Sequence, residues 1–173
     1  DFESRVVNAK TIESKITNKT RAVVVVHLYG YIADMPEIRQ LCTDNDLILI
    51  EDCAQSLGTS LGGKRAGTYG DMSIFSHHSQ KNISTLGEGG VLVVKNPKFA
   101  EIVPMLRHNG HLGYQDQEYY WKPAMSNVDY PKINGNYIEP NNYCLGEPQC
   151  AVGSMIIDRV DSVNSLKRSR AIQ

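Results

Sequence analysis

Two charged residues stand where a sheet of parallel strands would present a binding site. Asp52 follows the apolar run 48–50, and Lys81 lies in a polar segment, rich in serine, histidine and glycine, that follows the short apolar run 72–76. Ligands of open α/β sheets bind beyond the carboxyl ends of the strands. An acid and a lysine that converge on one such crevice are what pyridoxal 5'-phosphate (PLP) chemistry requires, because the acid keeps the pyridine nitrogen protonated and the lysine forms a Schiff base. Taken alone, Asp52 also fits an aspartate that caps the next helix.

A phosphate group would need donors close to this pair. Ser76 and the loop after it offer hydroxyl and amide donors for that purpose. The glycine-rich stretch 87–90 in the same segment is explained in part as a plain turn into the next strand.

The histidines fit structural roles better than metal binding. His27 ends a buried strand, where a histidine with satisfied hydrogen bonds is expected. His77 and His78 could form a metal site with Asp71 only if they faced the same way, and adjacent residues in an extended backbone face opposite ways. No further ligand has the required spacing, so we expect no metal site here.

Hydrophobic patterning predicts an α/β fold. Apolar runs rich in β-branched residues predict strands at 22–28, 47–50, 72–76 and 90–94. Helical spacing predicts helices over 11–16, 36–45 and 97–108, and a final helix with one face formed by Val152, Met155, Ile156, Val160 and Val163. The alternation of strands and helices favours a mostly parallel sheet with right-handed crossovers. The continuous run at 22–28 is typical of a strand buried on both faces.

The segment from Gly110 to Tyr143 is the longest stretch without periodicity. It is too long for a simple turn, so we expect a binding or interface loop. Its aromatic residues support an interface, because such residues are enriched in interface cores; they are Tyr114, Tyr119, Tyr120, Trp121, Tyr130 and Tyr137. The alternative is a loop that folds back on its own domain.

Composition indicates one ordinary globular domain. The 173 residues are 41% hydrophobic and carry a net charge of -1, so neither nucleic acid nor a membrane is expected as a partner. Four cysteines lack the spacing of a metal or disulfide framework; Cys42 and Cys53 are expected to be reduced and packed, which favours the cytoplasm. The chain opens without Met, and residues 166–173 continue a helix without a stop signal, so we expect a fragment of a longer polypeptide.

Five segments in order carry a resemblance to a known family. They are His27-Leu28-Tyr29-Gly30 with Ala33-Asp34-Met35, Glu51 to Ser56, Gly67 to Asp71, Phe75 to Gly90 and Arg107-His108-Asn109-Gly110. Together they resemble the DegT/DnrJ/EryC1/StrS nucleotide-sugar aminotransferases over nearly the whole chain. The resemblance implies a three-layer α/β/α domain with a mostly parallel sheet, like the large domain of the aspartate-aminotransferase (fold type I) PLP enzymes.

The resemblance also implies a role for each matching residue. Asp52 pairs with the pyridinium nitrogen, Gln55 donates a hydrogen bond to the phenolic oxygen, and Ser76 contacts the phosphate. Lys81 forms the Schiff base and moves the proton during transamination, and Asn142 reaches the phosphate of a neighbouring subunit in a homodimer. Glutamate is the implied amino donor and a keto sugar on a nucleotide the implied acceptor.

The chain departs from the family pattern in several places. Cys144 stands where an arginine is common, which puts one contact across subunits in doubt, and His77 and Ser79 replace an aromatic residue and a proline before the lysine. The upstream phosphate-binding loop, the stacking aromatic residue and the small C-terminal domain are not among these residues. The isolated 173 residues, taken as a partial PLP-binding domain, are therefore expected to bind cofactor poorly and to be inactive.

Two other functions stay open at this point. Related enzymes that remove a sugar hydroxyl carry a histidine in place of the lysine, and Lys81 argues against that reaction. A non-catalytic or sensory protein that kept the fold is the second possibility. The intact Asp52, Gln55, Ser76 and Lys81 oppose it.

Overall fold

The computed structural model describes residues 5–110 and 131–172. The chain divides into two compact units, Asp1–Val93 with Glu147–Gln173, and Val94–Gly146. Each unit is described below by itself.

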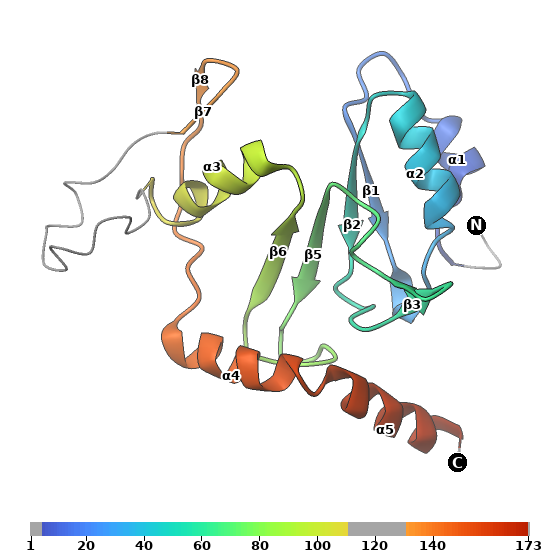
Figure 1. Cartoon of the computed structure of the whole chain (residues 1–173), viewed down its shortest axis with the longest axis vertical. Helices are drawn as coiled ribbons and strands as arrows, with labels where there is room; N and C mark the ends of the chain where they lie inside the picture. Colours follow the sequence, from blue (N-terminus) through green and yellow to red (C-terminus); the bar gives the residue numbers. More distant parts are fainter. Residues whose placement is uncertain (1–4, 111–130, 173) are drawn as a thin grey trace, which may run out of the picture. The chain divides into compact units, whose positions relative to one another are not determined.

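The first unit is built on a four-stranded sheet in the order β1-β2-β5-β6 (Figure 1), formed by β1 Ala22–Val26, β2 Ile48–Asp52, β5 Met72–Ser76 and β6 Gly90–Val94. β1 pairs with β2, and β2 with β5, in parallel. β6 runs the opposite way in Figure 1, and the His77 N–H donates to the Gly89 carbonyl where the two strands meet. The predicted α/β fold with a mostly parallel sheet is confirmed.

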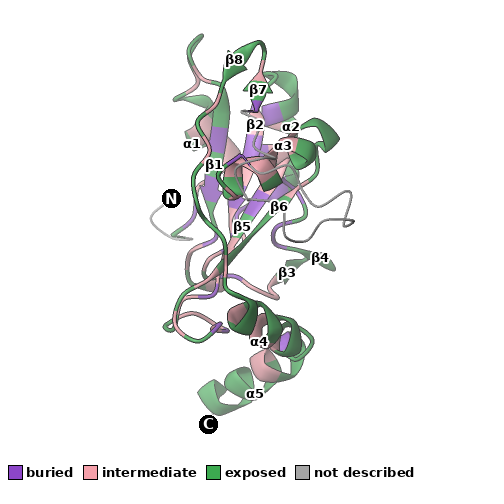
Figure 2. Cartoon of the chain, turned by 90° about the vertical axis from the view of Figure 1, so that its left-hand side faces the viewer, coloured by how far each residue is buried: buried purple, intermediate pink, exposed green. Residues whose placement is uncertain are grey.

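One face of the sheet carries the core. Val23, Val25 and Leu49 pack there against the buried side of α2, Met35–Asp44, and α1, Ala9–Glu13, lies against the same cluster through partly buried residues. Burying a side chain of this size contributes roughly 1.5–3 kcal/mol. Figure 2 colours the buried residues of β1 and β2 purple. Cys42 and Cys53 are buried free thiols, as predicted.

The other face of β1 is exposed, which contradicts the prediction that the run 22–28 is buried on both faces. The strand itself ends at Val26, and burial alternates along it. Val24 is 57% and Val26 44% exposed, whereas Val25 is fully buried. Burial alternates because only one face of β1 contacts the cluster around α2. A uniform run of valines gives no sign of this alternation.

Helix boundaries follow local capping. The side chain of Asn8 accepts a hydrogen bond from the Thr11 N–H at 2.9 Å, so α1 begins before the predicted residue 11. Proline in the first turn of α2 agrees with the predicted start at Pro36.

The C-terminal part of this unit is two helices, not one. α4 spans Glu147–Ile157 and α5 spans Val160–Ile172. The break turns Val160 inward, to 6% exposure, while Met155 on the same predicted stripe is 72% exposed. The predicted single apolar face is therefore wrong, because the stripe is divided between two helix axes.

Short elements complete the first unit. The chain after β1 forms a 3-10 turn, Leu28–Gly30, and the chain after β2 forms a small hairpin of β3, Ser60–Leu61, and β4, Lys64–Arg65. Among the described residues, no helix is long and apolar enough to cross a membrane.

The second unit contains α3, Pro97–Arg107, which confirms the helix predicted at 97–108. A hairpin of β7, Lys132–Ile133, and β8, Asn136–Tyr137, lies within the segment predicted as a loop and was not foreseen. Tyr137 is 68% exposed. The other aromatic residues predicted for an interface lie outside the described residues; they are Tyr114, Tyr119, Tyr120, Trp121 and Tyr130.

Candidate functional site

Asp52 and Ser76 both lie at the carboxyl edge of the sheet. Asp52 is the last residue of β2 and pairs in register with Ile74 of the neighbouring parallel strand. Ser76 ends β5 two residues later, and side chains two residues apart point to the same side of a strand. The structure therefore brings both predicted residues to one face and one edge of the sheet.

The carboxylate of Asp52 is held by its own loop. Its Oδ1 accepts a hydrogen bond from the Ala54 N–H at 3.0 Å, the pattern of an aspartate that initiates a turn. No helix begins after Asp52, since a turn and the hairpin of β3 and β4 follow it. The alternative of a helix cap is thereby excluded. Within the described residues, Oδ2 has no hydrogen-bond partner.

Gln55 has a fixed orientation. Its side-chain carbonyl accepts a hydrogen bond from the Tyr29 N–H at 2.9 Å. Because a backbone N–H requires an acceptor, the amide nitrogen of Gln55 is the group left to donate to a ligand. This agrees with the donor role that the resemblance implies.

Lys81 is held by its backbone while its amine is left uncommitted. The Lys81 N–H donates to the His78 carbonyl at 2.9 Å, and the Ser79 N–H donates to Gly87 across the loop at 2.7 Å. The hydroxyl of Ser76 accepts from the His78 N–H at 3.3 Å, so the loop is also tied to the end of β5. Among the described residues, Nζ of Lys81 makes no hydrogen bond or ion pair.

The two adjacent histidines have different environments. His77 is buried, and its Nε2 has no hydrogen-bond partner among the described residues. Burial lowers the pKa of His77, because the charged imidazolium loses its hydration. His78 is half-exposed and lies 3.4 Å from Glu88. Asp71 instead pairs with Arg39 at 2.9 Å, so these residues do not form a metal site together.

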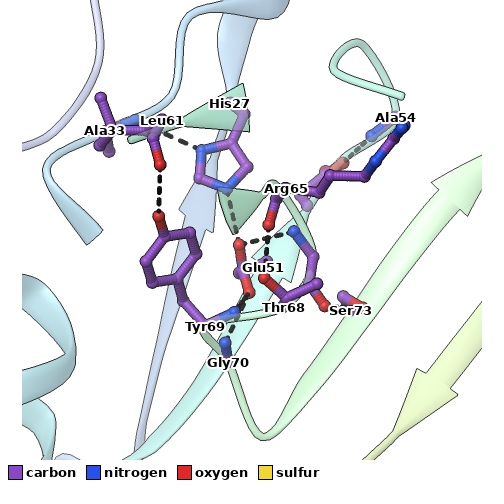
Figure 3. A network of polar contacts seen from close by, with 12 residues as sticks. His27, Ala33, Glu51, Ala54, Leu61, Arg65, Thr68, Tyr69, Gly70 and Ser73 are labelled. Atoms are coloured by element: carbon purple, nitrogen blue, oxygen red, sulfur yellow. Dashed lines mark hydrogen bonds and ion pairs between the residues drawn. The ribbon is translucent and has the colours of Figure 1, made fainter. Parts of the chain in front are cut away.

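The buried carboxylate of Glu51, the residue before Asp52, joins several chain segments through hydrogen bonds (Figure 3). Glu51 accepts hydrogen bonds from His27 Nε2 at 3.0 Å, from the Gly67 N–H at 2.8 Å and from the Tyr69 N–H at 2.7 Å, and also from the Gly70 N–H. Burial opposes ionisation of Glu51, but the hydrogen bonds from His27 and these amides outweigh it and lower the pKa.

The glycine at position 70 makes this close approach possible. A Cβ there would lie 2.8 Å from the carbonyl oxygens of both Leu49 and Met72. On the other side of the network, the Ala33 N–H donates to His27 Nδ1 at 3.4 Å, which leaves Nε2 as the donor to Glu51. The structural role predicted for His27 is confirmed.

Among the residues that the structure describes, one buried group has metal-ligand chemistry, namely His27, Glu51 and Cys53. Two facts oppose a metal. The four donors to Glu51 occupy its carboxylate oxygens, and burial with the charge of Glu51 raises the pKa of the Cys53 thiol to about 12, which keeps it protonated. This cluster is structural.

Asn142 belongs to the second unit. Its side-chain oxygen accepts from the Cys144 N–H at 3.1 Å, and its backbone bridges to His108. The amide nitrogen of Asn142 is left as a donor, and its role toward a phosphate stays a prediction. Cys144, at the position where arginine was expected, donates weakly to the Arg107 carbonyl at 3.8 Å.

Sequence reasoning missed the importance of Glu51, which was considered only as the neighbour of Asp52. The signal that could have revealed it is the alternation of residues between the two faces of β2. Glu51 lies between Leu49 and Cys53 on the buried face of β2, where a carboxylate needs several donors.

Comparison with known proteins matches the chain to one family. A sequence model of the DegT/DnrJ/EryC1/StrS aminotransferase family matches residues 1–173. GDP-perosamine synthase of Escherichia coli O157:H7 is 37% identical over 171 residues, which cover 99% of this chain and 42% of that protein. The Vibrio cholerae GDP-perosamine synthase is 34% identical over 169 residues, covering 98% and 41%.

A solved structure supports the same relationship. The X-ray structure of S. venezuelae DesV in complex with a ketimine intermediate matches with a TM-score of 0.72 at 32% identity, covering 91% of this chain and 37% of that one. The chain spans about two fifths of the length of the curated relatives it matches.

Proposed function

The chain belongs to the DegT/DnrJ/EryC1/StrS aminotransferase family, and on that premise we propose that it is the cofactor-binding part of a PLP-dependent aminotransferase. The proposed substrate is a keto sugar attached to a nucleotide, and the product is an amino sugar. The observation that carries the proposal is the carboxyl edge of the sheet. Asp52 and Ser76 share one face there, followed by a loop whose lysine amine has no partner among the described residues.

The residues present fit the cofactor. An uncommitted carboxylate oxygen, an oriented amide donor and an uncommitted amine are the three groups that a protonated pyridine ring with a phenolic oxygen and an aldehyde requires. Asp52 and Gln55 have these groups fixed by their hydrogen bonds to Ala54 and Tyr29. Lys81 supplies the amine.

Each residue then has a defined role. PLP, when bound, supplies the electron sink that stabilises negative charge on the reacting carbon of the substrate. Asp52 holds the proton on the ring nitrogen, and Gln55 donates to the phenolic oxygen. Ser76 donates its hydroxyl to the phosphate. Nζ of Lys81 would hold the cofactor and would also be the base that moves the proton at the reacting carbon.

The substrate class rests on the relatives. The names of the two perosamine synthases specify a nucleotide sugar, and both match nearly the whole chain. We propose glutamate as the amino donor and a homodimer as the working assembly, with Asn142 donated to the partner's phosphate. The free thiols of Cys42 and Cys53 favour the cytoplasm as the place of reaction.

Product analysis tests this function. The complete polypeptide, loaded with PLP, is given L-glutamate and a nucleotide-linked keto sugar, and mass spectrometry follows both products. We expect equal amounts of 2-oxoglutarate and amino sugar, no turnover with Lys81→Ala, and normal turnover with Lys98→Ala as the control. A sugar that loses a hydroxyl instead of gaining an amine would support a dehydratase. No turnover by the PLP-loaded wild type would support a non-catalytic protein.

A further inference from the structure

We propose that Asn164, on α5, is a positioning residue that fixes the loop carrying Lys81. This inference rests on the proposed function, since it assigns Asn164 a task only if Lys81 is the lysine that binds the cofactor. Asn164 itself need not touch cofactor or substrate.

Asn164 joins two loops that are distant in sequence. Its Nδ2 donates to the Leu57 carbonyl at 2.9 Å, and its Oδ1 accepts from Nδ2 of Asn82 at 2.9 Å. Asn82 Nδ2 also lies 3.4 Å from the Leu57 carbonyl, so the three groups close a triangle. We call Asn164, Asn82 and the Leu57 carbonyl the α5 clasp.

The clasp lies next to the predicted cofactor residues on both loops. Asn82 follows Lys81 directly, and Leu57 is two residues after Gln55. A displacement of Asn82 would move the backbone of Lys81 with it, because adjacent residues share one peptide plane. The clasp therefore sets the spacing between the loop that presents the amide of Gln55 and the loop that presents the amine.

Two further contacts hold α5 in place. Nζ of Lys167 donates to the backbone carbonyl of Asn82 at 3.1 Å and to its side chain at 3.2 Å. Near the start of the helix, Arg65 makes a bidentate pair with Asp161 at 2.7 and 3.0 Å. The exposed pair adds orientation more than stability, since water screens it.

The sequence leaves room for the clasp at Gly58. This residue has a φ of +83°, and a Cβ there would lie only 2.6 Å from Asn164 Nδ2 and 3.0 Å from Val160. A side chain at position 58 would thus displace Asn164 from the Leu57 carbonyl. The positive φ and the lack of space for a side chain therefore both favour glycine at position 58.

The hydrogen bonds of the α5 clasp involve none of the proposed catalytic groups. Neither asparagine is fully exposed. Asn82 donates to Asn164 and to the Leu57 carbonyl and accepts from Lys167, whereas Asn164 donates to the Leu57 carbonyl and accepts from Asn82. A structural role alone would predict an effect on unfolding only. A positioning role predicts an effect on the reactivity of Lys81 in protein that remains folded.

The test compares Asn164→Ala and Asn82→Ala with Ser165→Ala, an exposed neighbour on the same helix. The complete polypeptide of each variant is mixed with PLP, and two quantities are measured: the rate at which the visible absorbance of lysine-bound cofactor appears, and the pH midpoint of that absorbance. We expect roughly five- to tenfold slower binding and a shifted midpoint in both clasp variants, as the loss of one or two hydrogen bonds would cause. Ser165→Ala should match the wild type.

A double variant and a milder one complete the test. Because Asn164 and Asn82 share one contact, the double variant should lose less than the product of the two single losses. If Asn164→Ala fails to fold, as judged by circular dichroism, Lys167→Ala removes the contacts to Asn82 from an exposed position and should give a smaller loss of the same kind.

The outcomes separate the two proposals. If borohydride does not label Lys81 in the wild type, the proposed function fails. If the wild type is labelled at Lys81 but folded clasp variants match Ser165→Ala in both rate and midpoint, the positioning role of Asn164 is wrong while the proposed function stands.

Discussion

Asp52 has one carboxylate oxygen bound to its own loop and another without a partner among the described residues. The hydrogen bond from the Ala54 N–H fixes the plane of the carboxylate, so the second oxygen points in a defined direction. The second oxygen is therefore available to a ligand, as the proposed role of Asp52 requires.

Asp52→Asn should keep the covalent attachment of PLP to Lys81 but lose most turnover. An amide cannot keep the ring nitrogen protonated, and the loss of one charge-assisted hydrogen bond is worth about 1.5–3 kcal/mol, or roughly tenfold to a hundredfold in rate. Steady-state kinetics beside the visible spectrum of the loaded protein measure both effects. Near-normal turnover would mean that Asp52 serves only the turn.

Glu51→Gln should destabilise the protein without removing Lys81 chemistry. The amide nitrogen would face backbone N–H donors in place of an acceptor oxygen, and each buried group left unsatisfied costs about 1–3 kcal/mol. Urea unfolding at pH 7 measures the difference from the wild type. An unchanged midpoint at constant slope would show that the Glu51 network contributes nothing to folding.

The same variant has a defined pH dependence. Because the pKa of Glu51 is lowered from its ordinary 4.5 in the folded protein, its charge stabilises the fold above 4.5. This stabilisation is lost as the pH falls from 4.5 through the lower folded-state pKa. The stability difference between the wild type and Glu51→Gln should therefore shrink in that window.

At the scale of elements, the helices and strands that were predicted correctly are those whose local sequence pattern agrees with their packing. The strands at 72–76 and 90–94 and the helix at 97–108 were found almost to the residue, since apolar patterning and Asn96 with its following proline mark their limits. The break between α4 and α5 was missed; beyond it, Val160 lies close to Gly58, a residue far away in the sequence. The positions of Asp52 and Ser76 at the ends of their strands were predicted, but the contacts that orient them were not, since these come from backbone groups.

The face of α2 that packs on the sheet should determine its contribution to stability. Ile38 is fully buried in the core, whereas the adjacent Glu37 is exposed. We expect Ile38→Ala to lower the free energy of unfolding by about 2–5 kcal/mol. Glu37→Ala should change it by about 0.5 kcal/mol or less. Equal losses in urea denaturation of the two variants would contradict the packing described for α2.

At the scale of the whole molecule, the proposed role of Asn142 would link the second unit to cofactor binding. The side-chain oxygen of Asn142 is committed to the Cys144 N–H, which leaves its amide nitrogen to donate. In a homodimer with shared sites, this nitrogen would bind the phosphate in the partner subunit. Loss of this contact would then lower the affinity for PLP without changing the assembly of the dimer.

Asn142→Ala should weaken PLP binding about tenfold while leaving the dimer intact, as expected for the loss of one hydrogen bond to a charged group. Asn141→Ala is the control, because only the backbone of Asn141 makes hydrogen bonds in the described structure. Equilibrium titration measures affinity, and sedimentation measures assembly. Equal affinities of the two variants for PLP would place Asn142 away from the phosphate.

The most direct test of the central claim is chemical labelling of the lysine. The complete polypeptide is incubated with PLP, reduced with borohydride, digested and mapped by mass spectrometry. The account predicts that the pyridoxyl group is found on Lys81, the lysine after the carboxyl edge of the sheet whose amine has no partner among the described residues. A label on Lys64 or Lys95, with Lys81 unmodified, would contradict the assignment of this edge as the cofactor site.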